Sequence, residues 1–446
     1  MVFLRSVGGY APTLAQDRRP EQPIVELRRV VTEVQIRVDR PKPTAYVIRR
    51  IKIKSSLIKS AIGVLPVLAL AAAGLTARAD PQPIHVSGQP QSPGVVFAMT
   101  NVAADNRVVA YKRASNGSLS EVASYSTGGH GKGDDFDASN GLLLGYSGGH
   151  RFLYASNAGS NDITVFSVQG TSLTVIQKIS ADGVLPESLT RYGNLLYVLD
   201  ESVAANEITG FTVGRDGKLA HLSGSTRPLA SPIAVPGDLE FSPDGRVLVV
   251  TDKGPSVIGS DVVENVIETF QMGSDGRPGQ ARPNRSFGRR NFAAAFLKNG
   301  LMLVAESGNP IPNFGAISSY RIDPNSGALA TITGSQHNFQ WDTCWVVITN
   351  DQRYAYTANF ISGTISSFRV GPGGNVALIN GRAAVEGLTS QPTDLRLSAD
   401  GRYLYNLLRG EGEVAAYRIE SDGSLSSLGR VGGLPANVGA SGLAAY

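Results

Sequence analysis

Residues 152–168 read FLYASNAGSNDITVFSV, and residues 403–419 read YLYNLLRGEGEVAAYRI. Both stretches contain an apolar run, a turn, and an alternating segment that ends close after an aromatic residue. Further copies centre on Phe97, Leu196, Leu248, Met302 and Ala355, with spacings of roughly 43 to 56 residues. A period of this length, filled with alternating strands and Gly-rich turns, is typical of β-propeller blades. The sequence therefore predicts an all-β, seven-bladed propeller with four strands in each blade.

Turn residues define the order of strands within each repeat. Asn116-Gly117, Asp216-Gly217 and Asp422-Gly423 separate strand-like runs, and such pairs favour two-residue hairpins because both positions tolerate a positive φ. A second turn, such as residues 242–246 (SPDGR), precedes the apolar run. Each unit is thus predicted to run inner strand, turn, second strand, loop, third strand, turn, outer strand.

The two ends of residues 94–446 predict how the ring closes. The last segment, Gly442–Tyr446, resembles an inner strand with nothing after it, whereas the first repeat, near Val95, has only the second, third and outer strands. We expect the C-terminal strand to complete the N-terminal blade, because this pairing removes two exposed sheet edges.

A basic and apolar segment precedes the predicted propeller. Basic residues between Arg49 and Lys59 are followed by an apolar run of about 15 residues, Ala61–Leu75, and then by Ala77-Arg78-Ala79. This pattern predicts a signal peptide over residues 47–79, cleaved after Ala79, which makes the protein secreted or periplasmic. The alternative, a membrane anchor, would need roughly 20 apolar residues, so no stable membrane span is expected. Residues 80–93 read as a linker, and residues 1–46 as an over-extended start of the reading frame.

Charge and cysteine content exclude several classes of protein. The chain has a formal net charge of +4, but the first 79 residues hold 14 Lys/Arg against 5 Asp/Glu, which leaves the remainder mildly acidic, at about −5. Such a body predicts no nucleic-acid partner. A single cysteine, Cys344, cannot form an internal disulfide, and the five histidines make a multi-histidine metal site unexpected. We expect a monomer without a cofactor, with calcium as the one candidate ion.

Several phrases resemble one protein family. Residues 242–251 (SPDGRVLVVT), 158–163 (AGSNDI), 224–229 (GSTRPL) and 344–347 (CWVV) are similar to the lactonase-family seven-bladed propellers, which include 6-phosphogluconolactonase and carboxymuconate-lactonizing enzyme. The similarity covers nearly all of residues 94–446 and is greatest for a secreted branch described as 3-carboxymuconate cyclase-like. It implies the propeller fold and the hydrolysis or formation of a small lactone. One departure is that residues 139–144 (SNGLLL) lack the histidine that the characterised members carry there.

One position in every repeat carries a polar residue, except in the last repeat. Counting four residues past the centre of each apolar run gives Asn101, Asn157, Asp200, Asp252, Glu306, Asn359 and Leu408. One interpretation is that these side chains cap loops through bonds to the backbone. The other is a cluster around the channel mouth that holds a cation or acts as a base. On the second interpretation Glu306 is the main catalytic candidate, and Asn157, Asp200, Asp252 and Asn359 bind substrate.

The loops between blades supply candidate partners for this ring. Lactone hydrolysis needs a base to activate water and a donor or cation to stabilise the oxyanion. We expect Glu306 or His337 to be the base and Arg289 or Arg290 to clamp a substrate carboxylate, with His130 and Arg227 as substrate-binding residues. The same loops also contain Lys132, Asp134, Asp135, Asp137, Arg285 and Asp342. For any one of these charges, a solvated loop residue is the simpler alternative.

Three functions remain open at this point. The first is a secreted lactonase or lactone-forming cycloisomerase that acts on a small lactone or carboxylate. The second is a non-catalytic propeller that binds a protein or a glycan. The third is a calcium-dependent lactone hydrolase in which Asp200, Asp252 and Glu306 hold the ion, since calcium prefers six to eight oxygen ligands.

Overall fold

A computed structural model describes residues 94–446, apart from residues 135, 203–205, 231–234, 255–264 and 309–310. All described residues belong to the unit that spans residues 84–446. The predicted over-extended start, signal peptide and linker (residues 1–46, 47–79 and 80–93) lie outside the described residues. Within the described part of the chain, no helix is long and apolar enough to cross a membrane.

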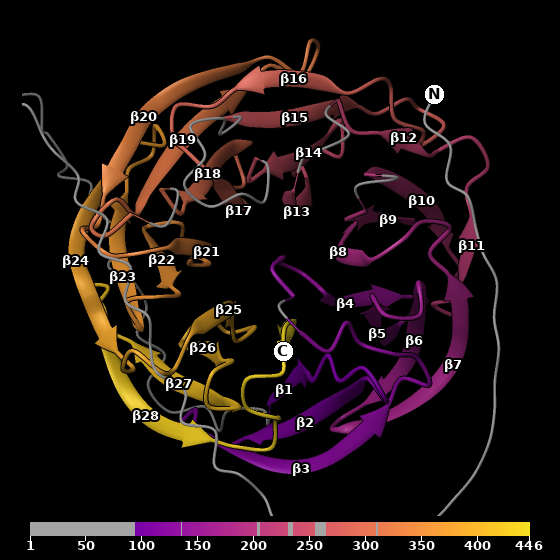
Figure 1. Cartoon of the computed structure of the whole chain (residues 1–446), viewed down its shortest axis with the longest axis horizontal. Coiled ribbons are helices and arrows are strands. Elements are labelled where there is room, and N and C mark those ends of the chain that lie inside the picture. Colours follow the sequence, from indigo (N-terminus) through magenta and orange to yellow (C-terminus); the bar gives the residue numbers. More distant parts are fainter. Residues whose placement is uncertain (1–93, 135, 203–205, 231–234, 255–264, 309–310) are drawn as a thin grey trace, which may run out of the picture. The chain divides into compact units, whose positions relative to one another are not determined.

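The described chain forms seven antiparallel sheets arranged as a ring, which confirms the seven-bladed propeller (Figure 1). Blade 1 contains β29 (Leu443–Ala445), β1 (Gly94–Met99), β2 (Arg107–Arg113) and β3 (Leu119–Ser126). Blade 2 contains β4 (Leu142–Ser147), β5 (His150–Asn157), β6 (Asp162–Gln169) and β7 (Ser172–Ser180). Blade 3 contains β8 (Pro186–Tyr192), β9 (Leu195–Asp200), β10 (Glu207–Val213), β11 (Leu219–His221) and β12 (Arg227–Pro228). Blade 4 contains β13 (Pro236–Phe241), β14 (Val247–Asp252), β15 (Val266–Gln271) and β16 (Arg282–Arg285).

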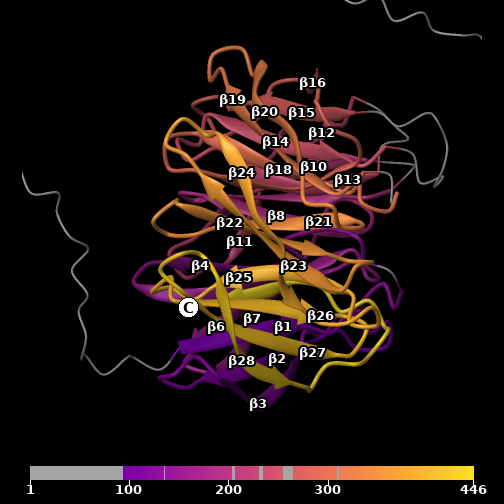
Figure 2. The same ribbon diagram turned by 90° about the vertical axis from the view of Figure 1, so that its left-hand side faces the viewer.

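The remaining three blades have the same four-stranded order. Blade 5 contains β17 (Asn291–Phe296), β18 (Leu301–Glu306), β19 (Ala316–Ile322) and β20 (Leu329–His337). Blade 6 contains β21 (Thr343–Ile348), β22 (Tyr354–Asn359), β23 (Thr364–Val370) and β24 (Val376–Val385). Blade 7 contains β25 (Pro392–Leu397), β26 (Tyr403–Leu408), β27 (Glu413–Ile419) and β28 (Leu425–Val431). Figure 2 views the ring from the side on which the outer strands β24 and β28 face the reader.

Blade 3 departs from the four-strand expectation at its outer edge. Both β11 and β12 pair with β10, through Phe211↔His221 and Ile208↔Arg227 respectively. A turn separates the two short strands, with Gly224 at φ 75° and the Ser225 amide bonded to the Leu222 carbonyl at 3.1 Å. The outer strand is therefore interrupted, and its two halves occupy one position in the sheet.

The C-terminal strand closes the ring as predicted. β29 pairs with β1 through Val96↔Ala445, Phe97↔Ala444 and Ala98↔Leu443. Reciprocal backbone bonds of 3.0 Å join Val95 to Tyr446 beyond this register. The pairing completes blade 1, so the first and last described segments are held by one sheet.

Hydrogen bonds between neighbouring blades explain why tyrosines and turn glycines recur at similar places in several repeats. A tyrosine of the second strand donates its hydroxyl proton to the glycine carbonyl of a hairpin turn in the next blade, with O···O distances of 2.7–3.4 Å. The pairs are Tyr154 with Gly217, Tyr197 with Gly276, Tyr356 with Gly423, and Tyr405 with Gly117. These glycines have φ of 78–93°, which favours glycine in the turn. At these four interfaces the turn therefore shapes a hairpin and also docks one blade onto the next.

Candidate functional site

The asparagines of the predicted polar ring hold loops together. The Asn157 amide donates to Asp162 Oδ1 at 2.7 Å and Thr164 Oγ1 at 2.9 Å, and its oxygen accepts from Asn106 and Thr127. Asn359 has the equivalent set of partners, with its amide donating to residues five and seven positions later. Both side chains are fully buried. These bonds join side chains to side chains, so they connect the loops but are not the side chain-to-backbone bonds of the capping interpretation, and a substrate-binding role for either residue stays a prediction.

Glu306 lies at the end of β18 beneath a glycine. Only 2% of Glu306 is exposed, and a Cβ added to Gly288 would lie 1.8 Å from the Glu306 carboxyl carbon. Ser335 donates a 2.6 Å hydrogen bond to Glu306 Oε2, and burial raises the pKa of this carboxyl. Substrate could reach Glu306 only if the loop that contains Gly288 moved. The predicted role of Glu306 as a base is therefore not supported by an open approach to its carboxylate.

The other acids of the ring are also covered. Asp200 is fully buried, and a Cβ added to Gly183 would lie 2.2 Å from its carboxyl group. Burial, and then Glu207 and Asp182, raise the pKa of Asp200 well above its usual value. Asp252 is likewise fully buried. Among the described residues, no three His, Cys, Asp or Glu side chains lie close enough to hold a metal ion, so calcium binding by Asp200, Asp252 and Glu306 stays a prediction.

The predicted loop residues are spread over several blades. His130, between blades 1 and 2, is exposed, and its Nδ1 lies 2.9 Å from the Ala103 carbonyl oxygen. Arg227 lies on β12 and donates to the carbonyls of Gly224 and Thr226. Arg289 is exposed and Arg290 is half-buried in the loop between blades 4 and 5. His337 interacts electrostatically with Glu306, and the Arg290 and Arg289 carbonyls accept backbone bonds from the two residues that follow Glu306.

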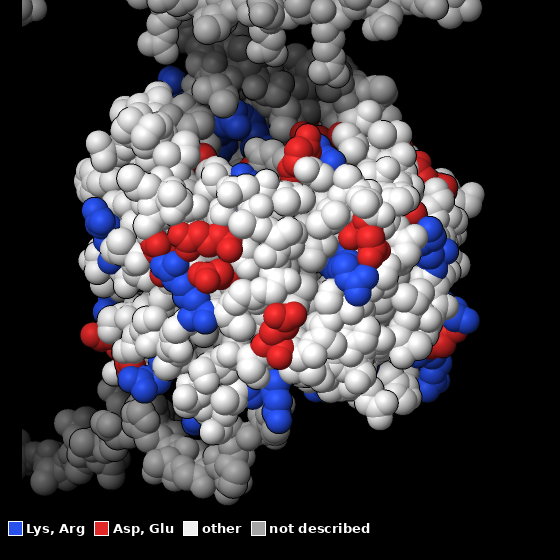
Figure 3. Space-filling model, turned by 60° about the horizontal axis from the view of Figure 1, so that its bottom comes forward, with Lys and Arg blue, Asp and Glu red and all other residues white. Residues whose placement is uncertain are grey.

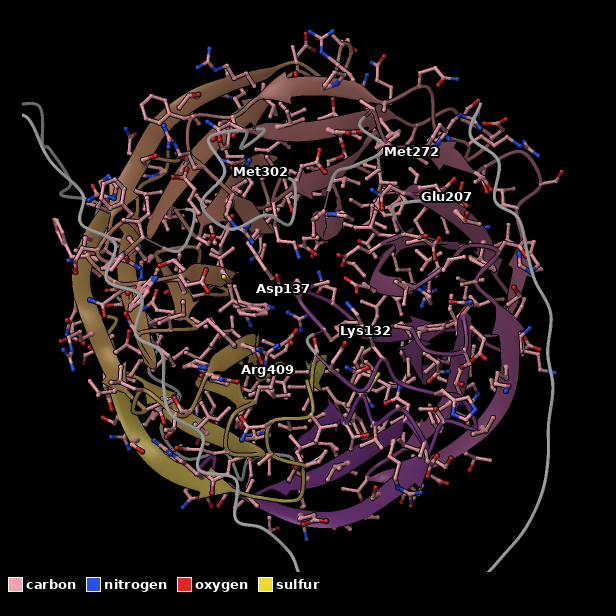
Figure 4. The ribbon with its side chains drawn as sticks, viewed as in Figure 1. Lys132, Asp137, Glu207, Met272, Met302 and Arg409 are labelled. Carbon is pink, nitrogen blue, oxygen red and sulfur yellow. The ribbon has the colours of Figure 1, made fainter. Side chains whose placement is uncertain are left out.

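A second group of charges gathers at the mouth of the channel; we call Lys132, Asp137, Glu187, Glu201 and Lys253 the mouth cluster. Lys253 Nζ lies 3.1 Å from Asp137 Oδ2 and also donates to the Asp137 carbonyl oxygen. Lys132 Nζ lies 3.5 Å from Glu187 Oε1. Figure 4 shows Lys132 and Asp137 close to the centre of the ring, well inside Glu207 and Met302.

Local backbone features aim two of these side chains at the mouth. Glu187 occupies a β-bulge in β8, between the pairs Pro186↔Asp200 and Ser188↔Leu199. Bulges are common next to active sites because the extra residue redirects a side chain. Lys253 directly follows β14, and its Nζ lies 4.9 Å from the centre of the Phe292 ring.

Exposure differs sharply within the mouth cluster. The Lys253 side chain is fully buried and Glu187 is 1% exposed, whereas 36% of the Asp137 side chain is exposed. Burial lowers the pKa of Lys253, but Asp137 and the two glutamates outweigh that effect and raise it, so the amine is a cation. Burial, and then the neighbouring Glu201 carboxyl, raise the pKa of Glu187 well above its usual value. Asp137 is thus far more accessible than Glu187, and a buried ammonium group fixes its position.

A second acid adjoins the mouth cluster from blade 6. Asp342 Oδ1 accepts a 3.3 Å hydrogen bond from the Cys344 thiol, and Arg290, Ser307 and Asp137 interact with its carboxyl. Burial and the Asp137 charge raise the pKa of Asp342 to about 6, although Arg290 opposes the shift. Arg290 therefore connects the loop between blades 4 and 5 with the mouth.

The raised pKa of Asp342 predicts a pH-dependent stability. Because its pKa in the folded state, about 6, exceeds the usual 3.8, the folded protein binds this proton more tightly, and its stability falls as pH rises from about 4 to 6. A pKa shift of this size changes the free energy of unfolding by at most about 3 kcal/mol. We expect Asp342→Asn to remove that part of the pH dependence, and thus to gain stability over wild type between pH 4 and 7. Urea unfolding of both proteins across this pH range measures the free energy of unfolding. If that free energy changed equally with pH in the two proteins, the result would contradict the prediction.

Below the mouth, a polar network crosses the channel. Asn140 Nδ2 donates 2.8 Å bonds to Asp238 and Glu240 of β13, and Arg396 of β25 donates to Asn140 Oδ1. Burial raises the pKa of Glu240 to about 8 and that of Asp238 to about 6. Asn140, Glu240 and Arg396 of this network line a cavity of about 370 Å³.

Sequence reasoning missed Lys253 and Glu187. Comparing one equivalent position per repeat identified Asp252 but not the lysine that follows it, and Glu187 lies one residue inside an inner strand. A lysine directly after a buried apolar strand and a glutamate within one are unusual, because such groups are rarely buried without a partner. A buried charge in an apolar strand could therefore have suggested that Lys253 and Glu187 need partners, and the loop around Asp137 offers such charges.

Charges also gather away from the mouth, around Arg430, which pairs with Glu386, Glu411 and Glu413. On the face shown in Figure 3, Lys and Arg lie in small groups mixed with Asp and Glu, with no broad basic area among the residues drawn in colour. The expectation that the chain has no nucleic-acid partner stays a prediction.

Comparison with known proteins gives the same architecture. Residues 95–236, about a third of the chain, match the family described as "Lactonase, 7-bladed beta-propeller". A periplasmic gluconolactonase of Pseudomonas aeruginosa is 17% identical, with a TM-score of 0.58, and the match covers 79% of this chain and 99% of that one. A Bacteroides fragilis protein proposed to be a 6-phosphogluconolactonase is 16% identical, with a TM-score of 0.59 and coverages of 80% and 99%.

A third structure, from Lactobacillus plantarum, is 14% identical with a TM-score of 0.60, and the match covers 80% of this chain and all of that chain. No curated protein matches the chain. At these identities the solved structures show the fold alone, and the family match covers residues 95–236. The resemblance to the lactonase-family seven-bladed propellers is thereby confirmed: residues 95–236 match that family, and the ring formed by residues 94–446 has its fold.

Proposed function

We propose that the protein hydrolyses a small lactone, or forms one by the reverse reaction, at the mouth cluster. The observation that carries the proposal is the Asp137–Lys253 pair, in which a fully buried ammonium group holds a partly exposed carboxylate. Names among the related structures also support it, since one is a gluconolactonase and another is proposed to be a 6-phosphogluconolactonase.

In the proposed reaction, Asp137 is the general base. Its carboxylate takes a proton from a water molecule, and the resulting hydroxide attacks the lactone carbonyl carbon. The Lys132 ammonium group, which is partly exposed, stabilises the oxyanion that forms. The bond between this carbon and the ring oxygen then breaks, and the Asp137 carboxylic acid returns its proton to the departing alkoxide. One lactone and one water thus give one hydroxy acid.

Lys253 acts on this reaction as a positioning residue. Its buried Nζ contacts both the side chain and the main chain of Asp137, so it fixes the direction of the carboxylate without touching substrate. The predicted roles of Arg289 and Arg290 as a clamp for a substrate carboxylate remain part of the proposal, because Arg290 interacts with Asp342 beside the mouth.

The first experiment is hydrolysis of a panel of small lactones by the protein from Asp80 onward, with and without a chelator. Turnover that the chelator leaves unchanged supports the metal-free reaction. Turnover lost with chelator would overturn it and favour the calcium-dependent alternative. No turnover on any lactone, under conditions where the protein is folded, would leave the binding propeller as the better description.

We also propose that the protein is exported and that cleavage follows Ala79. The motif at residues 47–79 supports this, and the P. aeruginosa relative is named as a periplasmic protein. Expression of the full chain in a Gram-negative host should give periplasmic protein whose N-terminal residue is Asp80. Recovery of a cytoplasmic protein that retains residues before Asp80 would contradict the proposal.

A further inference from the structure

Four exposed aromatic side chains lie in the loops of blades 5 and 6; we call them the aromatic shelf. Phe287, Phe314, Phe339 and Trp341 are 60%, 52%, 64% and 36% exposed, respectively. Single exposed apolar residues are common on soluble proteins, but several in one place mark an interaction site. The shelf is on the face of the ring that contains the mouth cluster, because its loops join blades or link second to third strands.

Contacts between the loops show that the shelf is one surface. The His337 ring lies 5.9 Å from the Phe314 ring and 6.5 Å from the Phe339 ring, measured between centroids. Backbone bonds of 3.0 Å join Gly315 to Gln340 and Asn338. These bonds tie the loop of Phe314 to the segment that contains Phe339 and Trp341.

Phe287 joins the same surface from the loop between blades 4 and 5. A Cβ added to Gly334 of β20 would lie 2.6 Å from the Phe287 ring, so this ring covers the glycine, three residues before His337. The Phe287 amide donates a 3.0 Å hydrogen bond to the Tyr320 hydroxyl oxygen, which fixes the start of the loop. Phe287, Phe314 and Phe339 therefore border the top of blade 5, whereas the Trp341 backbone is bonded to Ser362 of blade 6.

The shelf and the mouth cluster are joined by charged residues of the same loops. Arg289 and Arg290 follow Phe287 by two and three residues, and Asp342 follows Trp341 directly. Arg290 interacts with Asp342, which in turn interacts with Asp137 of the mouth cluster. Moving from the shelf to the mouth thus passes from apolar rings to guanidinium groups and then to the proposed base.

We propose that the aromatic shelf binds an aromatic ring of the substrate, which is an aryl-bearing or benzo-fused lactone whose hydroxy-acid product is anionic. This inference rests on the proposed lactone chemistry and names its substrate class. Aromatic rings of ligand and protein attract through edge and face contacts, and guanidinium groups attract both carboxylates and ring faces. Arg289, which is exposed, and Arg290 supply the positive charge that an aromatic acid requires. An aliphatic lactone would leave the exposed rings of the shelf without an aromatic partner.

The test compares a benzo-fused six-membered lactone with the aliphatic six-membered lactone. Wild type should prefer the benzo-fused lactone in kcat/KM by at least about 10-fold, and Phe314→Ala combined with Phe339→Ala should reduce that preference to about 2-fold, mainly through KM. Tyr146→Ala is the matched control, because Tyr146 is an exposed aromatic residue, 65% exposed, at the end of β4. An equal preference in the double variant and wild type would overturn the proposal.

A binding measurement separates this inference from the proposed reaction. Calorimetry with 2-naphthoate and with cyclohexanecarboxylate needs no turnover, and wild type should bind the naphthoate at least about 10-fold more tightly. The double variant should lose that difference, and the Tyr146→Ala control should keep it. Aromatic binding without hydrolysis of any lactone would contradict the reaction but keep the shelf, whereas hydrolysis without aromatic preference or naphthoate binding would overturn the shelf alone.

Discussion

Asp137→Asn is expected to lower kcat for lactone hydrolysis by at least about 100-fold, because a positioned general base contributes about 10²- to 10⁴-fold. Asparagine keeps the shape of the side chain and an oxygen that can accept from Lys253, but it cannot take a proton from water. KM should change little, since the lost interaction belongs to the transition state. Steady-state kinetics on the best lactone of the panel, with circular dichroism to confirm folding, measures the effect.

Glu306→Gln is the matched variant for this experiment. Glu306 is 2% exposed, and Ser335 and the loop of Gly288 cover it, so the amide should leave kcat within about 3-fold of wild type. If Glu306→Gln abolished turnover while Asp137→Asn preserved it, the base would be Glu306, as the sequence interpretation predicts. Loss in both variants with normal folding would show that the loop over Glu306 opens during turnover.

Removal of residues 442–446 is expected to destabilise the propeller by more than about 4 kcal/mol. The deletion exposes the edge of β1 and removes Leu443 and Ala444, both of which are buried. Loss of one large buried aliphatic side chain alone costs about 2–5 kcal/mol, and the unpaired edge also invites aggregation. Urea unfolding followed by tryptophan fluorescence measures the change.

Tyr446→Phe is the control for the deletion. It removes only the hydroxyl that donates a 2.8 Å bond to the Gly170 carbonyl, and it keeps the ring that packs on Arg151 at 4.3 Å. An exposed bond of this kind contributes about 1 kcal/mol or less. If the deletion cost no more than Tyr446→Phe, closure by β29 would not be what holds the ring.

The fold could be predicted because it repeats. Each repeat has the same alternation of strands and turns, so an ambiguous copy can be interpreted from the clear ones. The first repeat lacks an inner strand, so the last segment, Gly442–Tyr446, can pair only there. The split outer strand of blade 3 could not be predicted, because it depends on a local turn at Gly224, and among the described residues only this blade has a divided outer strand.

The candidate site was predictable only in part, since a repeat defines positions but not what covers them. Counting along each run placed Glu306 correctly at the end of its strand. Its burial depends on Gly288, a residue of the neighbouring interblade loop that sequence alone does not place above it. The mouth cluster in turn combines the loop of Asp137 with a bulge in blade 3 and a strand end in blade 4. Those three segments are distant in sequence and meet only because the ring is closed.

The tyrosine bonds between blades give the ring a direction. Blades 2, 3, 6 and 7 each present a hydroxyl to a turn glycine of the blade that follows, so these four interfaces run head to tail, as interfaces do in a cyclic oligomer. An assembly of this kind closes only when the rotation per interface multiplies to a full turn. The number of blades is therefore set by the rotation angles of all the interfaces together. A blade could be added or lost only if the remaining interfaces changed their angles.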